Sequence, residues 1–409
     1  MANNLSKGTL IAYDEVIDGF DAECVMSREV MTRTTDAQSM QRAGDVEYVS
    51  QEMYASVVTG LDLTLATKTD VIDRKVPITY RTPSNVIYEL DSLQMRDPSY
   101  MRDMGVAARK ALAADIDTSL ANNVASNGGI VIAKTGDYSW DMAAEAEVGL
   151  IVRGVTAGMD RKHFLNAFDA QKVSKDLGNR AYIGDLSKGA YERSQLPPIA
   201  NFRTFRTDNL VNSVVTGTVT STLVNGASQK LTVAAMTGGG AIQDNRSMTL
   251  NCDGANVANV KAGDTFTLPS VYAVHMVTKA STGVLQTFRV LSNTAGALVI
   301  TPPIVVDGPY QNVTAAPADN AALTFLNTAT KPIDPFWAQD ACVLSFGRLA
   351  VESGTGAGVT RATTKQGCEI VVIEQFNALT MKTIVRFTTL YGTAVLQPDK
   401  CGFVVANQV

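Results

Sequence analysis

The longest regular hydrophobic pattern in the chain runs from residue 97 to residue 129. Apolar side chains recur there three or four residues apart, as on one face of an α-helix, at Met101, Met104, Ala108, Leu112, Ile116, Leu120 and Val124. Charged residues fill most of the other positions, namely Arg102, Asp103, Arg109, Lys110, Asp115 and Asp117. Asp97 and Pro98 suit the start of a helix, and Asn127-Gly128-Gly129 suits its end. At about 1.5 Å per residue this helix would span roughly 45 Å. We interpret it as a spine rather than a coiled coil, because the stripe lacks a sustained heptad.

A shorter helical pattern lies in the first 38 residues. Ile11, Val16, Ile17 and Phe20 supply its apolar side, and the opposite side is acidic, with Asp14, Glu15, Asp18, Asp21 and Glu23. The pattern predicts an N-terminal arm that contains an amphipathic helix. Its acidic side is either a solvated face or a docking surface for a basic partner.

The hydrophobic period changes to two between Ser39 and Leu93, which is typical of strands. The strand-like segments are VEYVSQEMY, LDLTLAT, KVPITYRT and NVIYEL. They hold few apolar residues with which to build a core of their own. We therefore interpret residues 39–96 as a long hairpin that reaches across a neighbouring subunit.

Strands and helices alternate after the spine. The pattern predicts strands at 130–134 and 163–168, helices that begin at Ser139 and Asp169, and a further helix around 186–193. This mixture indicates an α+β fold.

The composition shifts at about Val214, and until about Thr330 the chain is rich in Thr, Val, Gly, Ala and Asn. Six segments there read as short strands: TGTVTSTLV, QKLTVAAM, SMTLNCDG, DTFTLPSVYAVHMV, LQTFRVLS and ALVITPPIV. Their spacing predicts a small antiparallel barrel or sandwich, with Gly263 in a tight turn. Because α+β texture resumes at Pro332, we interpret this stretch as an inserted domain. The C-terminal segments EIVVIEQF, MKTIVRFTTLYGTAVL and CGFVVAN also alternate, and we expect them to pair beside the spine.

Composition limits the class of protein without naming it. The chain has 409 residues, of which 45% are hydrophobic and 18% charged, as in an ordinary folded protein of two or three domains. A net charge of −5 gives no general basic surface for nucleic acid or anionic lipid. We expect neither a signal peptide nor a membrane span, because no run of about eighteen apolar residues occurs.

The sequence offers little for catalysis. Its five cysteines are far apart, so we expect buried reduced thiols rather than a metal site or disulfides. Both histidines, His163 and His275, lie in apolar strand-like segments. No phosphate-binding loop, zinc-protease motif or nucleophile elbow is found. The sequence therefore predicts no enzyme, no cofactor and no metal.

The order of these segments resembles that of the major coat proteins of P22-like short-tailed bacteriophages, which have the HK97-like capsid fold. The resemblance extends over nearly the whole chain. It is carried by IAYDEVID, SMQR, GLDLT, AARKALA, ANNVAS, KAGDTFTLPSVY, FRVLS, ALVITPPIV, YQNVTAAPADNAALTFLN, PFWAQDA and LYGTAV.

The resemblance implies an α+β fold with an inserted all-β barrel. Its parts would be an N-terminal arm (1–38), an extended loop hairpin (39–96), the spine helix (97–129), a peripheral domain (130–165), an axial domain (166–213), the inserted barrel (214–331), a second part of the axial domain (332–383) and peripheral strands (384–409).

The resemblance also implies partners. Such proteins assemble with copies of themselves, as pentamers and hexamers, around a scaffolding protein. The shell expands as double-stranded DNA enters through a portal protein, and it encloses that DNA without sequence-specific contacts and without a membrane.

Three candidate sites follow from this resemblance. Asp14, Glu15 and Asp18 would dock the basic end of the scaffolding protein, and Leu61, Asp62 and Lys68 would form the intersubunit tip of the hairpin. The loop at 237–248 would bridge capsomers, but it holds only Asp244 opposite Arg246 where relatives carry an acidic loop.

An alternative function is a receptor- or carbohydrate-binding β module of a virion, with residues 214–330 as the binding part. That stretch has few aromatic residues and no tryptophan, which is a weak basis for stacking on sugars.

Overall fold

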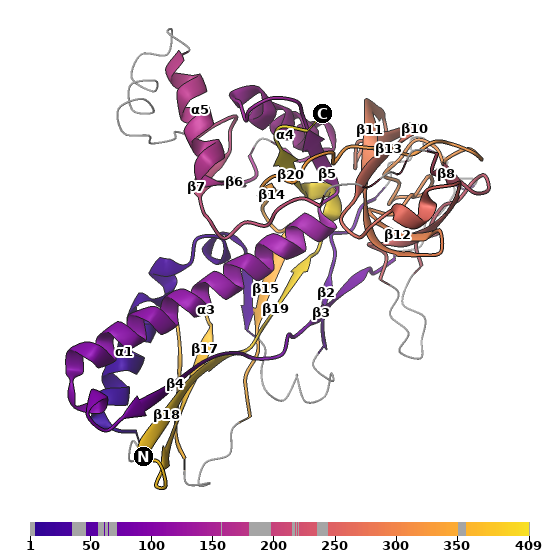
Figure 1. The fold of residues 1–409 in the computed structure, drawn as a ribbon. Helices are drawn as coiled ribbons and strands as arrows, with labels where there is room; N and C mark the ends of the chain where they lie inside the picture. The colour runs from indigo at the N-terminus through magenta and orange to yellow at the C-terminus, as the bar shows by residue number, and fades with distance from the viewer. Residues whose placement is uncertain are drawn as a thin grey trace. The chain divides into compact units, whose positions relative to one another are not determined.

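The computed structural model describes residues 5–34, 46–55, 61, 64, 72–156, 158–179, 198–214, 217, 219, 221–234, 244–350 and 357–408. They form two compact units. The first comprises Met1–Tyr48, Pro77–Leu120 and Val343–Ala394, and the second comprises Val49–Val76, Ala121–Cys342 and Val395–Val409. Both units combine helices with strands, as the α+β prediction requires (Figure 1).

The first unit is built from two helices, several strands and two short 3-10 turns. Its helices are α1 (Lys7–Glu23) and α3 (Pro98–Asn127), of which α3 continues into the second unit. The strands are β1 (Met31–Thr34), β4 (Ser84–Asp91), β15 (Cys342–Phe346), β16 (Gly358–Thr363), β17 (Glu369–Asn377), β18 (Lys382–Thr389) and β19 (Tyr391–Val395). The turns are η1 (Ser27–Glu29) and η2 (Gln94–Arg96).

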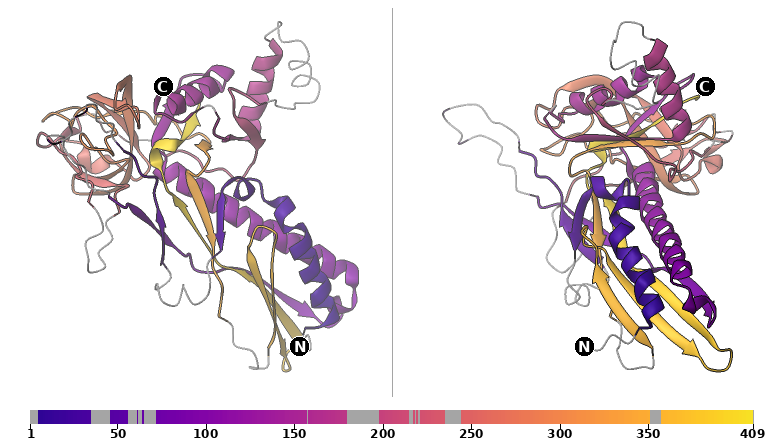
Figure 2. Two further views of the ribbon diagram at one scale, coloured as in Figure 1. Left: turned by 180° about the vertical axis from the view of Figure 1, so that it is seen from behind. Right: turned by 90° about the vertical axis from the view of Figure 1, so that its left-hand side faces the viewer.

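The two helices lie side by side against one face of the sheet β16-β17-β18-β4, as Figures 1 and 2 both show. The core between them contains Val16 and Phe20 of α1, Ile116 of α3, and Val385 and Phe387 of β18. The stripe predicted for the spine is confirmed, since all seven of its apolar residues are buried. One charged position is not where the pattern placed it. Asp117, expected on the outer surface of the helix, is fully buried.

Strand β4 belongs to this sheet and not to a hairpin. It pairs antiparallel with β18 along its whole length, from Asp91 opposite Lys382 to Ser84 opposite Thr389. The prediction that residues 39–96 form one hairpin is therefore wrong for residues 84–91. Sequence alternation cannot choose a strand's partner, because pairing depends on residues far along the chain.

The second unit contains the other elements. Its helices are α4 (Trp140–Val152) and α5 (Ala167–Asn179). One sheet is formed by β5 (Ile130–Ala133), β20 (Cys401–Val405), β14 (Asp334–Ala338), β6 (Arg161–Leu165) and β7 (Arg203–Arg206), in that order. Strands β2 (Val46–Ser50) and β3 (Lys75–Thr79) pair with each other, and the division between the units passes through both. The turn η4 (Pro398–Lys400) precedes β20.

Helices α4 and α5 cover one face of the five-stranded sheet. Successive residues of β5 point to opposite faces of the sheet. Ile130 and Ile132 pack with α4 and α5 in one core, and Val131 packs with Phe403 and Val405 in a core on the other face. Two predicted domain boundaries cut through sheets of the structure, the first through this five-stranded sheet and the second through the sheet β16-β17-β18-β4. The boundary at 165/166 separates β6 from β7, which pair in parallel, and the boundary at 383/384 falls inside β18.

The insert has its own sheet and core. Its strands are β13 (Thr324–Phe325), β10 (Thr265–Val274), β11 (Ser281–Thr294), β12 (Ala297–Thr301), β9 (Met248–Asp253) and β8 (Leu223–Val224), in sheet order, with the turn η3 (Val257–Asn259). The backbone N–H of Val224 donates to the carbonyl of Ala321, and that of Leu323 donates to the carbonyl of Thr222. These bonds join β8, at one edge of the six-stranded sheet, to the residues that directly precede β13, at the other edge, and so connect the two edges of the sheet.

Two details of the insert were predicted with different success. Gly263 has a φ of +97° in the turn before β10, as predicted. The segment QKLTVAAM is wrong as a strand, since residues 229–234 have no regular structure. The sixth strand is β13 instead. Ser213 and Lys331 lie together at the base of the insert: the Ser213 N–H donates to the carbonyl of Lys331, and the Ser213 hydroxyl accepts the Lys331 N–H and donates to the carbonyl of Ala329.

All five cysteines are buried free thiols, as predicted. The helix predicted around 186–193 lies outside the described residues. None of the described helices has the length and the apolar composition needed to cross a bilayer.

Candidate assembly surfaces

Two of the three residues predicted on the acidic face of α1, Asp14 and Asp18, are exposed. Ser6 caps the helix, and its hydroxyl accepts the Thr9 N–H at 3.3 Å. Val16 and Phe20 turn into the core, so Asp14 and Asp18, one helical turn apart, are left exposed. These two carboxylates form a small, solvent-accessible negative patch.

Glu15 does not belong to this patch, which corrects the prediction that grouped it with Asp14 and Asp18. Its carboxylate pairs with the guanidinium of Arg109 at 2.8 Å, and Arg109 also pairs with Glu23 at 3.3 Å. Arg109 lies on α3 and is largely buried against α1. Glu15 therefore fixes α1 to the spine, a role that spacing within the arm could not reveal.

The two residues predicted to bridge capsomers, Asp244 and Arg246, form an ion pair with each other. The Arg246 guanidinium donates to both carboxylate oxygens of Asp244, the shortest bond being 2.6 Å, and also to the carbonyl of Val395 at 2.9 Å. Both residues lie in the second unit, as does Val395. The rest of the predicted loop, residues 237–243, lies outside the described part of the chain.

The base of the hairpin is anchored to the C-terminal segment of the same chain. The Tyr54 hydroxyl donates to the side chain of Gln397 at 3.0 Å, and Lys400 forms an ion pair with Glu52. At the predicted tip, Leu61 is fully exposed, whereas Asp62 and Lys68 lie outside the described residues.

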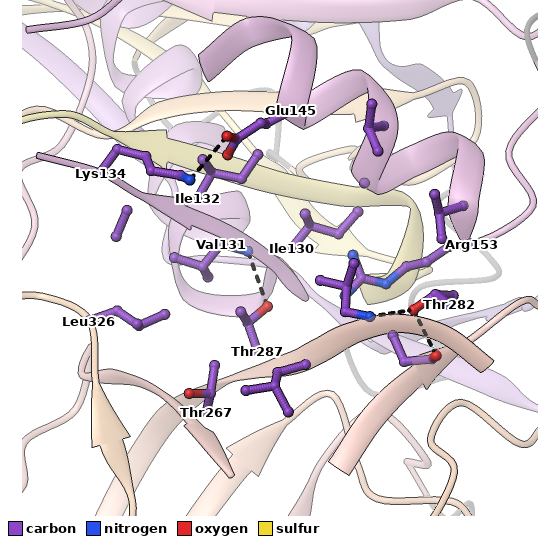
Figure 3. Close-up of a pocket in the computed structure, with 17 residues that line it drawn as sticks. Ile130, Val131, Ile132, Lys134, Glu145, Arg153, Thr267, Thr282, Thr287 and Leu326 are labelled. Carbon is purple, nitrogen blue, oxygen red and sulfur yellow. Dashed lines mark hydrogen bonds and ion pairs between the residues drawn. The ribbon is translucent and has the colours of Figure 1, made fainter. Parts of the chain in front are cut away.

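A pocket of about 490 Å³ lies between the five-stranded sheet and the insert (Figure 3). Its walls come from β5 and α4 on one side and from β10 and β11 on the other. Thr287 bridges the two sides: its hydroxyl donates to the carbonyl of Gly129 at 2.7 Å and accepts the N–H of Val131 at 3.1 Å. The insert is thus joined to the sheet by a few polar bonds beside an open, mainly apolar space.

His163 and Asp334 are ionisable groups of the second unit that are buried among other side chains. His163 is buried, with its Nε2 atom 3.2 Å from the Tyr138 hydroxyl, and burial lowers its pKa to about 3. Asp334 is fully buried next to Asp169, so burial and the Asp169 charge raise its pKa well above the ordinary value. A histidine that stays neutral throughout the physiological range is not a proton carrier there. Among the described residues, no cluster of three or more potential metal ligands occurs.

Sequence reasoning missed the residues that connect these parts. Arg109 appeared only as one of several charges on the spine, and Thr287 as one of many strand threonines. Their roles depend on partners distant in sequence, so no local signal marks them.

Comparison with known families matches residues 1–406 to the family described as P22 coat protein, gene protein 5. Among solved structures, the CUS-3 coat protein I-domain is 36% identical and is covered completely by 27% of this chain, with a TM-score of 0.22. The mature capsid of bacteriophage PhiM1 is 10% identical over 93% of this chain and 86% of that chain, with a TM-score of 0.46. The capsid of cyanophage P-SCSP1u is 11% identical over 92% and 86%, with a TM-score of 0.45.

The family match carries the assignment, because it spans almost the whole sequence. The chain belongs to the P22 coat protein family and is a major capsid protein, a structural component of the icosahedral shell of a virion.

Proposed function

We propose that this coat protein assembles as pentamers and hexamers into a precursor shell around a scaffolding protein. The shell then expands while double-stranded DNA is packaged through a portal protein at one vertex. We place this assembly in the host cytoplasm and assign no enzymatic reaction to the chain. The observation that carries the proposal is the family match over residues 1–406.

The hairpin supports self-assembly. Among the described residues, strands β2 and β3 form a two-stranded sheet, and a two-stranded ribbon is marginally stable in water by itself. Its base is held by the chain's own C-terminal segment, while Leu61 at the tip is fully exposed. We propose that the tip, including Leu61, Asp62 and Lys68, contacts the neighbouring subunit.

The negative net charge of the chain supports the proposal that the shell encloses DNA. The chain carries a net charge of −5, so an array of copies has no overall attraction for DNA phosphates. Packed DNA is then enclosed without being bound by the wall.

Two surfaces are assigned to further contacts. We assign the scaffolding protein's basic end to Asp14 and Asp18, which are exposed, and not to Glu15, which pairs with Arg109. Contacts between capsomers through the loop at 237–248 would receive little from Asp244 and Arg246, because these two neutralise each other.

The test is assembly of the full-length chain with and without the hairpin tip. Electron microscopy of the chain co-expressed with its scaffolding protein should reveal closed shells. A variant that lacks residues 61–69 should keep the thermal unfolding midpoint of the free subunit, because Leu61 is fully exposed, yet form few shells. Discrete monomers from the unmodified chain would contradict the coat assignment. Intact shells from the deletion variant, with a markedly lowered midpoint, would contradict only the role of the hairpin.

A further inference from the structure

A small cavity of about 20 Å³ lies where four segments of the second unit meet. The hairpin base contributes Tyr54 and Arg74, the residue after α4 contributes Arg153, the insert contributes Lys279 and Tyr310, and η4 contributes Asp399. The cavity is distinct from the larger apolar pocket beside Thr287, although Arg153 lines both.

Positive charge is in excess at this cavity. Arg74, Arg153 and Lys279 face a single carboxylate, Asp399, which interacts electrostatically with all three. Their hydrogen-bond partners are neutral oxygens: Arg74 donates to the carbonyl of Glu52 at 3.0 Å, Arg153 to the side chain of Gln286 at 2.9 Å, and Lys279 to the carbonyl of Gln311 at 3.3 Å. The lining side chains therefore carry a formal charge of about +2, with Arg153 buried and Arg74 and Lys279 half-buried.

Two donors at the cavity have no acceptor. Within the described part of the chain, the Nε atoms of Arg74 and Arg153 are buried and make no hydrogen bond. Arg153 is only 6% exposed, so water outside the protein cannot readily satisfy it. A buried donor left without an acceptor is costly, so an acceptor within reach of these two groups would stabilise the junction.

The aromatic walls hold the cations without neutralising them. The Arg74 guanidinium lies 3.8 Å from the centre of the Tyr310 ring, and the Lys279 ammonium lies 5.6 Å from that of Tyr54. The hydroxyl groups are used elsewhere, since Tyr310 donates to the carbonyl of Ile72 at 2.8 Å and Tyr54 donates to Gln397. Burial lowers the pKa of Lys279 to about 8, which still leaves the ammonium mainly charged at neutral pH.

We infer that this cavity binds one monatomic anion, of which chloride is the common example. A space of this size admits a single water-sized particle and excludes sulfate, phosphate and carboxylates. A water molecule would satisfy the free donors but would leave the excess charge uncompensated. Because the ion would contact the hairpin base, the end of α4 and the insert together, it would fix these three segments at their junction. The inference stands independently of the assembly proposed above.

The test measures halide binding to the unassembled, full-length chain. The chlorine NMR line of chloride should broaden in its presence and narrow again on titration with bromide. At constant ionic strength, replacing gluconate by chloride should raise the thermal unfolding midpoint saturably, by about 2–4 °C. Lys279→Met should abolish both effects, because it removes one of the charges that holds the ion while keeping an apolar stem.

The matched control is Lys230→Met in the same insert. The Lys230 ammonium pairs with Asp307 at 2.7 Å on the surface, so this variant should retain both halide effects. If Lys279→Met fails to fold, Lys279→Gln replaces it in the same comparison. Absence of chloride-specific broadening in the unmodified chain would overturn the inference in favour of a bound water. Equal halide effects in the Lys279 and Lys230 variants would also overturn it.

Discussion

Ser27 donates its backbone N–H to the buried carboxylate of Asp117 at a distance of 3.0 Å. The other carboxylate oxygen accepts the N–H groups of Val25 and Met26, at 2.9 and 3.2 Å. One side chain of α3 thus satisfies three successive backbone donors in the turn that follows α1. Burial raises the pKa of Asp117, and these backbone N–H groups act in the opposite direction.

Replacing Asp117 by asparagine tests this connection. Asp117→Asn keeps the size of the side chain but substitutes an NH₂ group for one acceptor, so at least one buried N–H loses its partner. We expect the free energy of unfolding to fall by about 1–3 kcal/mol. Urea unfolding of the full-length subunit measures the change. The control is Asp103→Asn on the exposed side of the same helix, expected to change stability by less than about 0.5 kcal/mol. Equal losses in the two variants would show that the three bonds contribute nothing specific.

Because His163 is buried, we expect the stability of the folded chain to be sensitive to acid. Its pKa is about 3 in the folded chain because of burial, compared with about 6.5 when unfolded. Between these values the unfolded chain binds a proton that the folded chain does not, so stability falls as the pH falls below about 6.5. This residue should remove about 2 kcal/mol between pH 7 and pH 5.

His163→Gln should lack that component while keeping a polar partner for Tyr138. Urea unfolding at both pH values, in the variant and the unmodified chain, gives the difference. The raised pKa of Asp334 acts in the opposite sense, because it favours the folded state as the pH falls, but it is present in both proteins and cancels. An identical loss of stability on acidification in both proteins would contradict the prediction.

Because Asp14 and Asp18 are exposed, we expect the contact between the arm and the scaffolding protein to be sensitive to salt. Exposed ion pairs are worth about 0.2–1 kcal/mol each, so Asp14→Lys should weaken scaffold recruitment modestly. Asp14→Lys combined with Asp18→Lys should abolish recruitment, and added salt should reduce recruitment by the unmodified coat. The measurement is scaffold content of precursor shells across a series of ionic strengths.

Glu15→Gln separates docking from folding. Because Glu15 pairs with Arg109, this change should destabilise the subunit slightly and leave the salt dependence of scaffold content unaltered. Normal scaffold content in the double charge reversal would return Asp14 and Asp18 to the role of an ordinary solvated face.

The insert should fold by itself. Residues 213–331 have their own core, and their two ends are joined by hydrogen bonds between Ser213 and Lys331. Expressed alone, this segment should have a β-rich circular dichroism spectrum and a cooperative melting transition. Phe266→Ala should lower its stability by about 3–5 kcal/mol, because that ring is fully buried against Phe288. A disordered spectrum for the unmodified segment would refute the prediction.

The sequence by itself determined the elements whose signal is local. The spine was predicted at 97–129 and is Pro98–Asn127, because its apolar side chains repeat with the period of a helix and capping residues flank them. The insert was equally readable, since composition changes abruptly at both of its ends. The coat-protein prediction came instead from the resemblance of collinear sequence segments to those of P22-like coat proteins.

Only the tertiary structure decided which distant residues meet. Asp117 has the sequence context of a surface charge, yet it is buried because the turn after α1 presents three N–H groups to it. Glu15 has the spacing of a docking residue, yet Arg109 of α3 neutralises it. Strand β5 pairs with β20, and β4 with β18, across most of the chain. Periodicity reports which face of an element is buried, whereas the identity of its partner depends on side chains hundreds of residues away, which no local pattern records.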